Sequence, residues 1–599
     1  MSGMILNSTY RTWALCIAVV LFLIQTPDWA YIPQTLGYLC VFGICLEYLA
    51  NHSNKNLSFT PVTFFALGYT GICMLSLTWS NVLYHSIAIL PLYCLLPVLI
   101  VIFKDENKEA KYALFFKVIF VASLILSLIS ITNVVFLKNI QWGDAHLPFY
   151  NSNSLAVFLG VGALISAYNF IFLKQYKYCF GGVLIFLAIL ATGSAGSVLA
   201  LLCVLGTMLL LTLTKRVNFL KQTYVIFGVL ISFLVFIILI VSFNDVIIET
   251  LMKAGSRLPI WQSAIETVLS TNPYIGNGIG TFRDVFKNVY LSVIERGSVT
   301  MGLHAHNDVL HLWVEIGLIG LMFVFGIVMV TTFQSIKKIF FQGKQHIALP
   351  AAILLYCAMM AMITPVIALP CVLVIIGVSI IQITNQASSS VIIPYGNQIL
   401  SLLLIVLSCI AIQNGFGGYF MGNVKSAISK GDLIQLVEST DKLDATTMRL
   451  HPSAPIFRAS SILAMYDQNI IPPHQKEKAL NELNSYIQDG RRRNPYNAEV
   501  DFYEGEYFLR SGQNDRAKNI FTKILDYDPT YASARIKLFS LINDKNRAYD
   551  VLKNGLNYEY WQQNPQQLYG FIYLEAKKRD DHGIAKDVEA RLKNLYSPK

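Results

Sequence analysis

The sequence predicts an all-α protein. We expect a polytopic bundle of about 12–13 transmembrane helices at residues 1–414 and a soluble α-helical domain at residues 415–599. Hydrophobic residues make up 54% of the 599 residues and charged residues only 14%, whereas a soluble domain carries roughly 25% charge. Long apolar runs recur through the first 414 residues. Of the 82 charged side chains, 33 lie in residues 1–414 and 49 in residues 415–599, so the chain changes character near residue 414.

Composition also excludes several classes of protein. A soluble enzyme, a disordered chain and a secreted disulfide scaffold do not fit this hydrophobicity. The net charge of +10 does not indicate nucleic-acid binding, because +7 falls in residues 1–414 and only +3 in the tail. All ten cysteines lie at or before Cys409, in or beside apolar segments, where a thiol behaves as a small hydrophobic group. No cleavable signal peptide is predicted, because further apolar segments follow the first one closely.

Thirteen segments have the length and apolarity of a membrane-spanning helix. They lie near residues 12–28, 31–50, 62–80, 82–103, 113–137, 154–173, 179–193, 197–214, 223–243, 308–333, 347–366, 368–384 and 399–414. The pair at 347–384 is one apolar stretch broken around Pro365 and Pro370, so a single bent helix or a re-entrant pair is an alternative there.

The distribution of lysine and arginine predicts a cytoplasmic N-terminus. These residues prefer cytoplasmic loops, and they cluster after the second, fourth, sixth, eighth and tenth segments, as Lys174 and Lys177 illustrate. The periplasmic side then receives residues 138–153 and the long segment 244–307. Thirteen spans place the tail in the periplasm, whereas twelve would place it in the cytoplasm.

The long outer segment is basic, against this charge bias. Its basic residues are Lys253, Arg257, Arg283, Lys287 and Arg296. A bound anion would explain them, and so would pairing with the acids Asp245, Glu249, Asp284 and Glu295.

The tail carries a repeat signal. Asn494-Pro495 recurs as Asp528-Pro529, 34 residues later, which is the period of tetratricopeptide repeats. Small and aromatic residues occupy the consensus positions between them, namely Gly505, Phe508, Ala517 and Phe521. Residues 455–490 and 532–556 resemble weaker repeats, and 560–595 a capping helix pair. Such a stack either caps the membrane domain passively or docks a protein partner.

A polar segment at residues 302–320 lies where the long outer segment re-enters the membrane. Polar groups at this depth are costly and usually line a cavity or a site. If a helix begins near residue 302, then His304, Asp308, His311 and Glu315 share one face, while His306 and Asn307 project elsewhere. Gly317 and Gly320 would permit close helix packing.

Three interpretations of this polar segment are open. It could be a structural stripe between helices, a metal site or the location of a catalytic histidine, which can accept a proton near neutral pH. The metal interpretation is the weakest, because the HExxH spacing and a second ligand cluster are absent from the sequence.

Three motifs resemble those of the bacterial O-antigen ligase superfamily, which includes O-antigen ligases, protein O-oligosaccharyltransferases and related polymerases. The motifs are His306-Asn307 followed by Gly317-Leu-Ile-Gly320, Arg257-Leu-Pro-Ile-Trp261 followed by Asn272-Pro273 and Gly276-Asn-Gly-Ile-Gly280, and Phe149-Tyr-Asn-Ser-Asn153. One position departs from the pattern: Ala195 stands where the family often has an arginine. A second cation is therefore open between Arg283 and Arg296.

The resemblance implies a multi-pass glycosyltransferase of the bacterial inner membrane. Its donor would be a glycan on undecaprenyl pyrophosphate, and transfer to a hydroxyl on the periplasmic face would be inverting and would need no metal or cofactor. His306 would be the general base and Arg257 would stabilise the leaving pyrophosphate. Further substrate-binding candidates are Asn153, Asn307, Arg283, Arg296 and His304, although both asparagines could equally satisfy helix-end backbone groups.

The acceptor remains open within the family. It could be a Ser or Thr of a pilin-like protein, a lipid A–core sugar or, for a polymerase, a growing glycan. The helical tail favours a protein acceptor or partner. A transporter of lipid-linked glycans is the alternative from another class, but transporters often have internal pseudo-repeats and binding sites at the membrane midplane, and neither is evident in this sequence.

Overall fold

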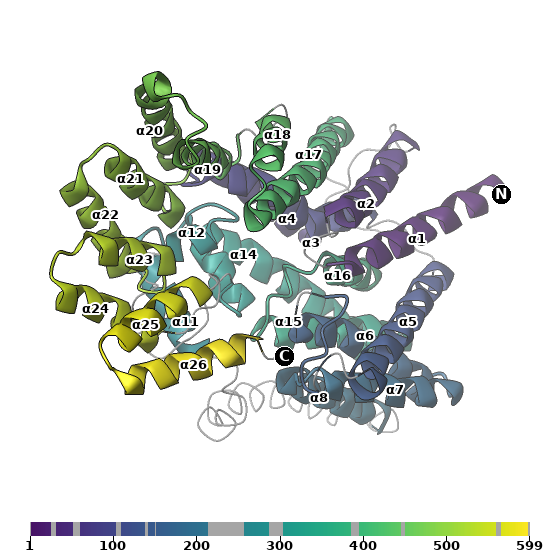
Figure 1. Cartoon of the computed structure of the whole chain (residues 1–599). Helices are drawn as coiled ribbons and strands as arrows, with labels where there is room; N and C mark the ends of the chain where they lie inside the picture. Colours follow the sequence, from purple (N-terminus) through teal and green to yellow (C-terminus); the bar gives the residue numbers. More distant parts are fainter. Residues whose placement is uncertain are drawn as a thin grey trace.

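The computed structural model describes residues 2–25, 31–51, 60–103, 109–137, 140, 142–149, 151–213, 257–286, 304–384, 395–444, 450–558 and 565–596. Every regular element in these ranges is a helix (Figure 1), which confirms the predicted all-α class. The expected span at 223–243 lies outside the described residues.

The apolar helices form a bundle that matches the remaining expected spans. They are α1 (Ser2–Leu23), α2 (Tyr31–Asn51), α3 (Pro61–Leu75), α4 (Leu83–Phe103), α5 (Glu109–Ile131), α6 (Ser152–Ile171), α7 (Lys177–Ala191), α8 (Ala195–Leu213), α14 (Asp308–Ile336), α15 (Ala348–Ala361), α16 (Pro370–Thr384) and α17 (Gly396–Lys430). Eight helices of the described chain are long and apolar enough to cross a membrane, and four shorter apolar helices accompany them.

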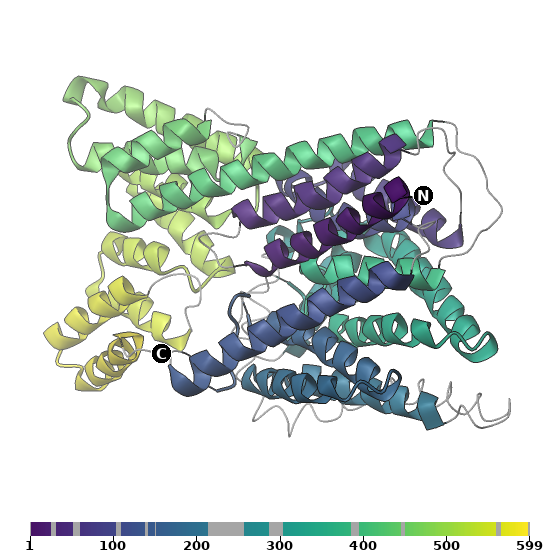
Figure 2. The same cartoon turned by 90° about the vertical axis from the view of Figure 1, so that its right-hand side faces the viewer.

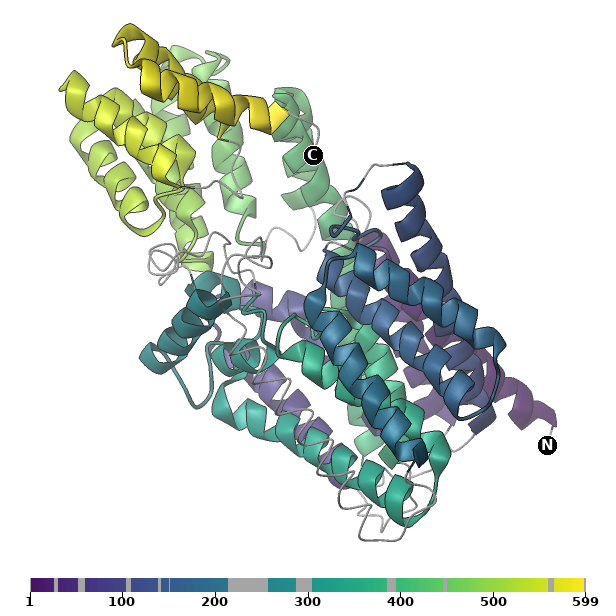
Figure 3. The same cartoon turned by 90° about the horizontal axis from the view of Figure 1, so that it is seen from below.

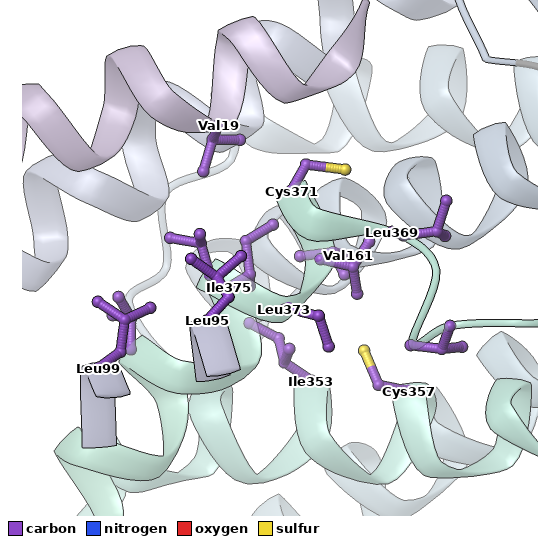
Figure 4. Packing of buried hydrophobic residues seen from close by; sticks show 14 of the residues in the cluster. Val19, Leu95, Leu99, Val161, Ile353, Cys357, Leu369, Cys371, Leu373 and Ile375 are labelled. Atoms are coloured by element: carbon purple, nitrogen blue, oxygen red, sulfur yellow. The ribbon is translucent and has the colours of Figure 1, made fainter. Parts of the chain in front are cut away.

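The core of the bundle is continuous between distant segments. Leu95 of α4, Val161 of α6, Ile353 of α15 and Ile375 of α16 are fully buried in one cluster (Figure 4). Close packing of these side chains fixes α15 and α16 against helices from much earlier in the chain.

The stretch at 347–384 forms two helices rather than one bent helix. Helices α15 and α16 pack against each other across a turn at residues 362–369. In that turn the Ile367 amide donates a hydrogen bond to Asp308 Oδ2 at the start of α14, at 2.9 Å. The turn therefore lies at the same end of the bundle as the polar segment. This is the position that a turn between two membrane-crossing helices would have.

Loops of the predicted outer side meet at one end of the bundle. The Gln25 amide donates to the Pro148 carbonyl at 3.1 Å, and the Gly143 amide donates to the Ala191 carbonyl at 2.9 Å. The basic residues near 174–177 follow the opposite end of α6. The two groups of loops thus lie at opposite ends of the bundle, as the charge pattern predicts.

Helix α17 joins the bundle to the tail. Its 35 residues span about 52 Å at 1.5 Å per residue, more than the roughly 30 Å hydrocarbon core of a bilayer. It continues without interruption through the predicted boundary at residues 414 and 415 and carries the tail to the end of the bundle opposite the N-terminus (Figure 2).

After α18 (Leu433–Asp444), the described helices of the tail form four pairs. They are α19 (Ala454–Asp467) with α20 (Lys476–Arg493), α21 (Ala498–Arg510) with α22 (Asn514–Tyr527), α23 (Ala532–Leu541) with α24 (Lys545–Lys553), and α25 (Gln566–Lys578) with α26 (His582–Tyr596). In the second pair, a β carbon on Gly505 would lie 2.6 Å from the ring of Phe521, which is fully buried. The small residue at 505 therefore permits the close approach of α21 and α22.

Candidate functional site

Helix α14 begins at Asp308 and is interrupted at Gly317, where φ is 65° and ψ is −173°. This start agrees with the expected span at 308–333, whereas the face that depends on a start near residue 302 loses His304, which precedes the helix. Glycine adopts such a positive φ readily, and a β carbon at 317 would lie 2.3 Å from the carbonyl carbon of Tyr274. Gly317 breaks the helix, and it is not the simple helix-packing contact that the sequence suggested.

The glycine-rich turn at residues 272–280 fills this interruption. The Leu318 amide donates to the Pro273 carbonyl and the Gly278 amide donates to the Glu315 carbonyl, both at 2.9 Å. Gly276 has a φ of 72°, and a β carbon there would lie 2.3 Å from the Glu315 oxygen. The turn thus satisfies backbone groups that the break exposes, so two of the motifs form one structural unit.

Gly317→Ala is expected to destabilise the protein by about 1–3 kcal/mol, because alanine is strained at this φ and its methyl group collides with the turn. The check is the thermal unfolding midpoint of the purified protein in detergent. Gly206→Ala in α8 is the matched control, because a β carbon there meets nothing within 4 Å. Equal unfolding midpoints for the two variants would contradict this assignment.

Helix α11 (Arg257–Ser270) brings Arg257 to His306. It packs against α14, between the bundle and the tail (Figures 1 and 3). Trp261 Nε1 donates to the Ala305 carbonyl at 3.0 Å, immediately before His306, and Arg257 lies one helical turn before Trp261 on the same face. The arginine and the histidine of the two motifs are therefore close enough for the charge of Arg257 to lower the pKa of His306.

The electrostatics of this pair follow from burial and from their proximity. Burial lowers the pKa of His306 to about 4, and the positive charge of Arg257 acts in the same direction. Burial lowers the pKa of Arg257 to about 10, so the guanidinium remains protonated at neutral pH. At neutral pH the site thus combines an uncharged imidazole with a cation.

Several buried polar atoms around the pair have no hydrogen-bond partner. They are Nδ1 of His304, His306 and His311 and Oδ1 of Asp308, judged over the described part of the chain. Buried polar groups in native proteins are almost always paired. His306 also has a φ of 51°, which is uncommon for a residue other than glycine and is typical of functional sites. A polar ligand would satisfy this cluster.

The two candidate asparagines differ in their positions. Asn307 is the N-cap of α14, and its Oδ1 accepts from the amides of Val309 and Leu310 at 3.0 and 3.1 Å. Asn307 therefore satisfies backbone groups at a helix end, which was the structural alternative to substrate binding. Asn153 lies in the first turn of α6, where the cap is Asn151. A substrate contact by either asparagine stays a prediction.

Glu315 organises the polar stripe inside the bundle. Its Oε1 accepts from the Phe282 amide at 3.1 Å and lies 3.4 Å from His311 Nε2, and its other oxygen accepts from the Tyr93 hydroxyl. At Glu315 the polar stripe therefore joins helices to one another, as the structural interpretation expects. Tyr93 was not singled out from the sequence, although its hydroxyl within the apolar segment 82–103 was a signal.

A cavity of about 510 Å³ adjoins the cluster, between α2, α4, α14 and α17. Its wall is mostly apolar and includes His304 and His311. Other polar residues of the wall include Gln34, Thr35, Tyr84, Arg283, Glu315, Asn414 and His451. Arg283, from α12 (Phe282–Phe286), is exposed there, whereas Arg257 and His306 do not line the cavity. Arg296, Lys253 and Lys287 lie outside the described residues.

Comparison with known families points to the same part of the chain. Residues 180–325 match the family model described as O-antigen ligase. The match includes Arg257, the glycine-rich turn and His306. No curated protein matches the chain. Residues 180–325 are thus similar to the O-antigen ligase family, which supports the resemblance to the O-antigen ligase superfamily.

Proposed function

We propose that the protein transfers a glycan from undecaprenyl pyrophosphate to a hydroxyl acceptor on the periplasmic face of the bacterial inner membrane. The observation that carries this proposal is the proximity of half-buried Arg257 to neutral His306 at the end of the bundle that bears the tail. The N-terminus would then be cytoplasmic, and the site and tail periplasmic.

The reaction is an in-line displacement at the anomeric carbon. His306 accepts the proton of the acceptor hydroxyl as its oxygen forms the new glycosidic bond. The bond between the anomeric carbon and the phosphate oxygen breaks, and the pyrophosphate leaves with the electron pair, so the anomeric configuration inverts. Arg257 binds the leaving phosphate through the paired N–H groups of its guanidinium. A fixed cation in a water-poor site stabilises such developing charge more than water does.

Donor binding should strengthen the base. In the free protein the guanidinium of Arg257 contributes to the low pKa of His306. A bound pyrophosphate offsets that positive charge, so the pKa of His306 rises toward its ordinary value. A base whose pKa lies closer to the working pH is more effective.

This change predicts two different acid limits. Because the pKa of His306 in the free protein is about 4, its neutral form persists to low pH, and kcat/KM for the donor should fall only near that value. The donor complex has a higher pKa, so kcat should begin to fall at a higher pH. Profiles of kcat and kcat/KM against pH report the bound and free forms respectively. Coincident acid limits would contradict the proposed effect of the donor.

The deciding experiment is transfer by the purified protein in lipid vesicles. Lipid-linked glycan would be supplied with either envelope proteins or lipid A–core, both taken from a bacterial strain that lacks this transferase. We expect a mass increase of one glycan on a protein Ser or Thr. A lipid A–core product would identify a ligase, and elongation of the lipid-linked glycan would identify a polymerase. No transfer to any acceptor would overturn the proposed function.

A further inference from the structure

The helical tail is attached to the site through one buried carboxylate. Asn494 Nδ2, between α20 and α21, donates to Asp284 Oδ1 at 2.8 Å. Asp284 Oδ2 lies 2.7 Å from His85 Nδ1 at the start of α4. Asp284 is 3% exposed, so water does not screen these contacts. The carboxylate of α12 thus joins the tail to the membrane bundle.

A second contact reaches the helix that carries Arg257. Tyr496 packs on an apolar cluster that α11 and α14 form, whose buried members include Ile260, Ala264 and Val314. The tail therefore contacts α12 through Asp284 and the cluster of α11 and α14 through Tyr496.

The tail also supplies part of the cavity wall. His451, which precedes α19, lines the cavity, and its ring lies edge-on to Tyr84 with 4.8 Å between ring centroids. Its Nδ1 accepts from the Ser453 amide at 3.0 Å, which places the ring proton on Nε2. Burial lowers the pKa of His451 to about 3, so the ring stays neutral and offers one N–H donor.

The geometry of an inverting displacement assigns this cavity to one substrate. The attacking oxygen and the leaving phosphate lie on opposite sides of the anomeric carbon. Arg257 marks the phosphate side and does not line the cavity, whereas the cavity wall includes His304, two residues before His306 in the chain. The acceptor therefore approaches through the cavity.

The charges of the wall indicate the class of acceptor. Arg283 is the one lysine or arginine among the described residues that line the cavity, and it is accompanied by the acidic Glu315. A phosphorylated lipid A–core is strongly anionic and would require a cationic wall. A mostly apolar wall with aromatic rings and few polar groups fits an apolar polypeptide segment with one hydroxyl.

We propose that the docked tail forms part of the acceptor site, and that His451 Nε2 donates a hydrogen bond to a polypeptide acceptor that presents a Ser or Thr. This inference rests on the proposed function. His451 is a specificity residue here, and Asn494 is a positioning residue that acts through Asp284.

The Asn494→Asp variant tests the attachment. It keeps the oxygen that accepts from the Tyr496 amide, and the equivalent Asp528 makes the same turn with Thr530, so the local fold tolerates aspartate. It places a carboxylate against Asp284, and like charges at such a contact should raise the acceptor KM at least about tenfold. The donor KM should not change.

Asn497→Asp is the matched control for this substitution. Asn497 caps α21 through the Glu499 amide, where aspartate serves equally well. We expect the acceptor KM of this variant to equal that of the wild type. An equal acceptor KM for Asn494→Asp and Asn497→Asp, with wild-type unfolding midpoints, would overturn the role of the attachment.

Two further variants test His451 with the envelope-protein acceptor described above. The His451→Asn variant keeps an acceptor for the Ser453 amide but lacks the distal donor, so it should raise the acceptor KM about three- to tenfold. His451→Gln places an amide N–H near the position of Nε2 and should restore most of the affinity. A wild-type acceptor KM in His451→Asn, or efficient transfer to lipid A–core alone, would overturn the inference. Failure of the wild type with every acceptor would instead reject the proposed function.

Discussion

Replacing His306 with alanine should lower glycan transfer by about 10²- to 10⁴-fold, the usual contribution of a general base. Without the imidazole, the acceptor hydroxyl must attack while it still holds its proton. The imidazole is neutral in the free protein because burial and the adjacent Arg257 lower its pKa to about 4. The measurement is the transfer rate in vesicles at saturating donor, normalised to the amount of inserted protein.

A second substitution separates this chemical effect from backbone strain. His306 has a φ of 51°, a conformation that asparagine tolerates better than alanine. His306→Asn should therefore keep the wild-type unfolding midpoint and still lose transfer. Transfer at the wild-type rate in both variants would remove His306 from the mechanism.

Arg257→Lys should lower the transfer rate by about 10²-fold, even though it conserves the charge. Lysine presents a point charge and cannot make the paired hydrogen bonds by which a guanidinium binds phosphate. Arg257 lies one turn before Trp261, whose indole anchors the helix to the segment before His306, so the backbone position of Arg257 is fixed. Turnover of the donor by this variant is the quantity to compare with that of the wild type.

The control for Arg257 exploits its effect on His306. Arg257→Gln removes the positive charge, so the pKa of His306 should rise, whereas Arg257→Lys should leave it low. The pH dependence of diethylpyrocarbonate modification, which requires a neutral imidazole, measures this difference. Arg516→Lys on the exposed surface of the tail should change neither quantity. Wild-type turnover in Arg257→Lys would show that the arginine does not bind the leaving group.

The sequence predicted the architecture well where periodicity and apolarity are local properties. The spans outside 223–243, the helical tail and the consensus positions of Gly505 and Phe521 all follow from such patterns. The break at Gly317 could not be predicted in the same way, because it depends on contacts with a turn earlier in the chain. Leu318 donates a hydrogen bond to Pro273 of that turn, and Gly278 of the turn donates one to Glu315.

The candidate site was predictable only through its motifs. The order of the motifs placed Arg257 and His306 in one region, but the contact between them depends on the docking of α11 against α14. The polar network of Asp284, His85 and Asn494 had no sequence signal, since its members are 199 and 210 residues apart in the chain. Asn494 was interpreted only as part of a repeat.

The most direct measurement is a single-turnover assay in which each variant is first loaded with lipid-linked glycan and then mixed with acceptor. If the imidazole takes the acceptor proton and the guanidinium receives the departing pyrophosphate, His306→Asn will bind the donor as tightly as the wild type but will not transfer it. Arg257→Lys will bind the donor more weakly and transfer it slowly. Transfer of bound glycan by His306→Asn at the wild-type rate would contradict the central claim.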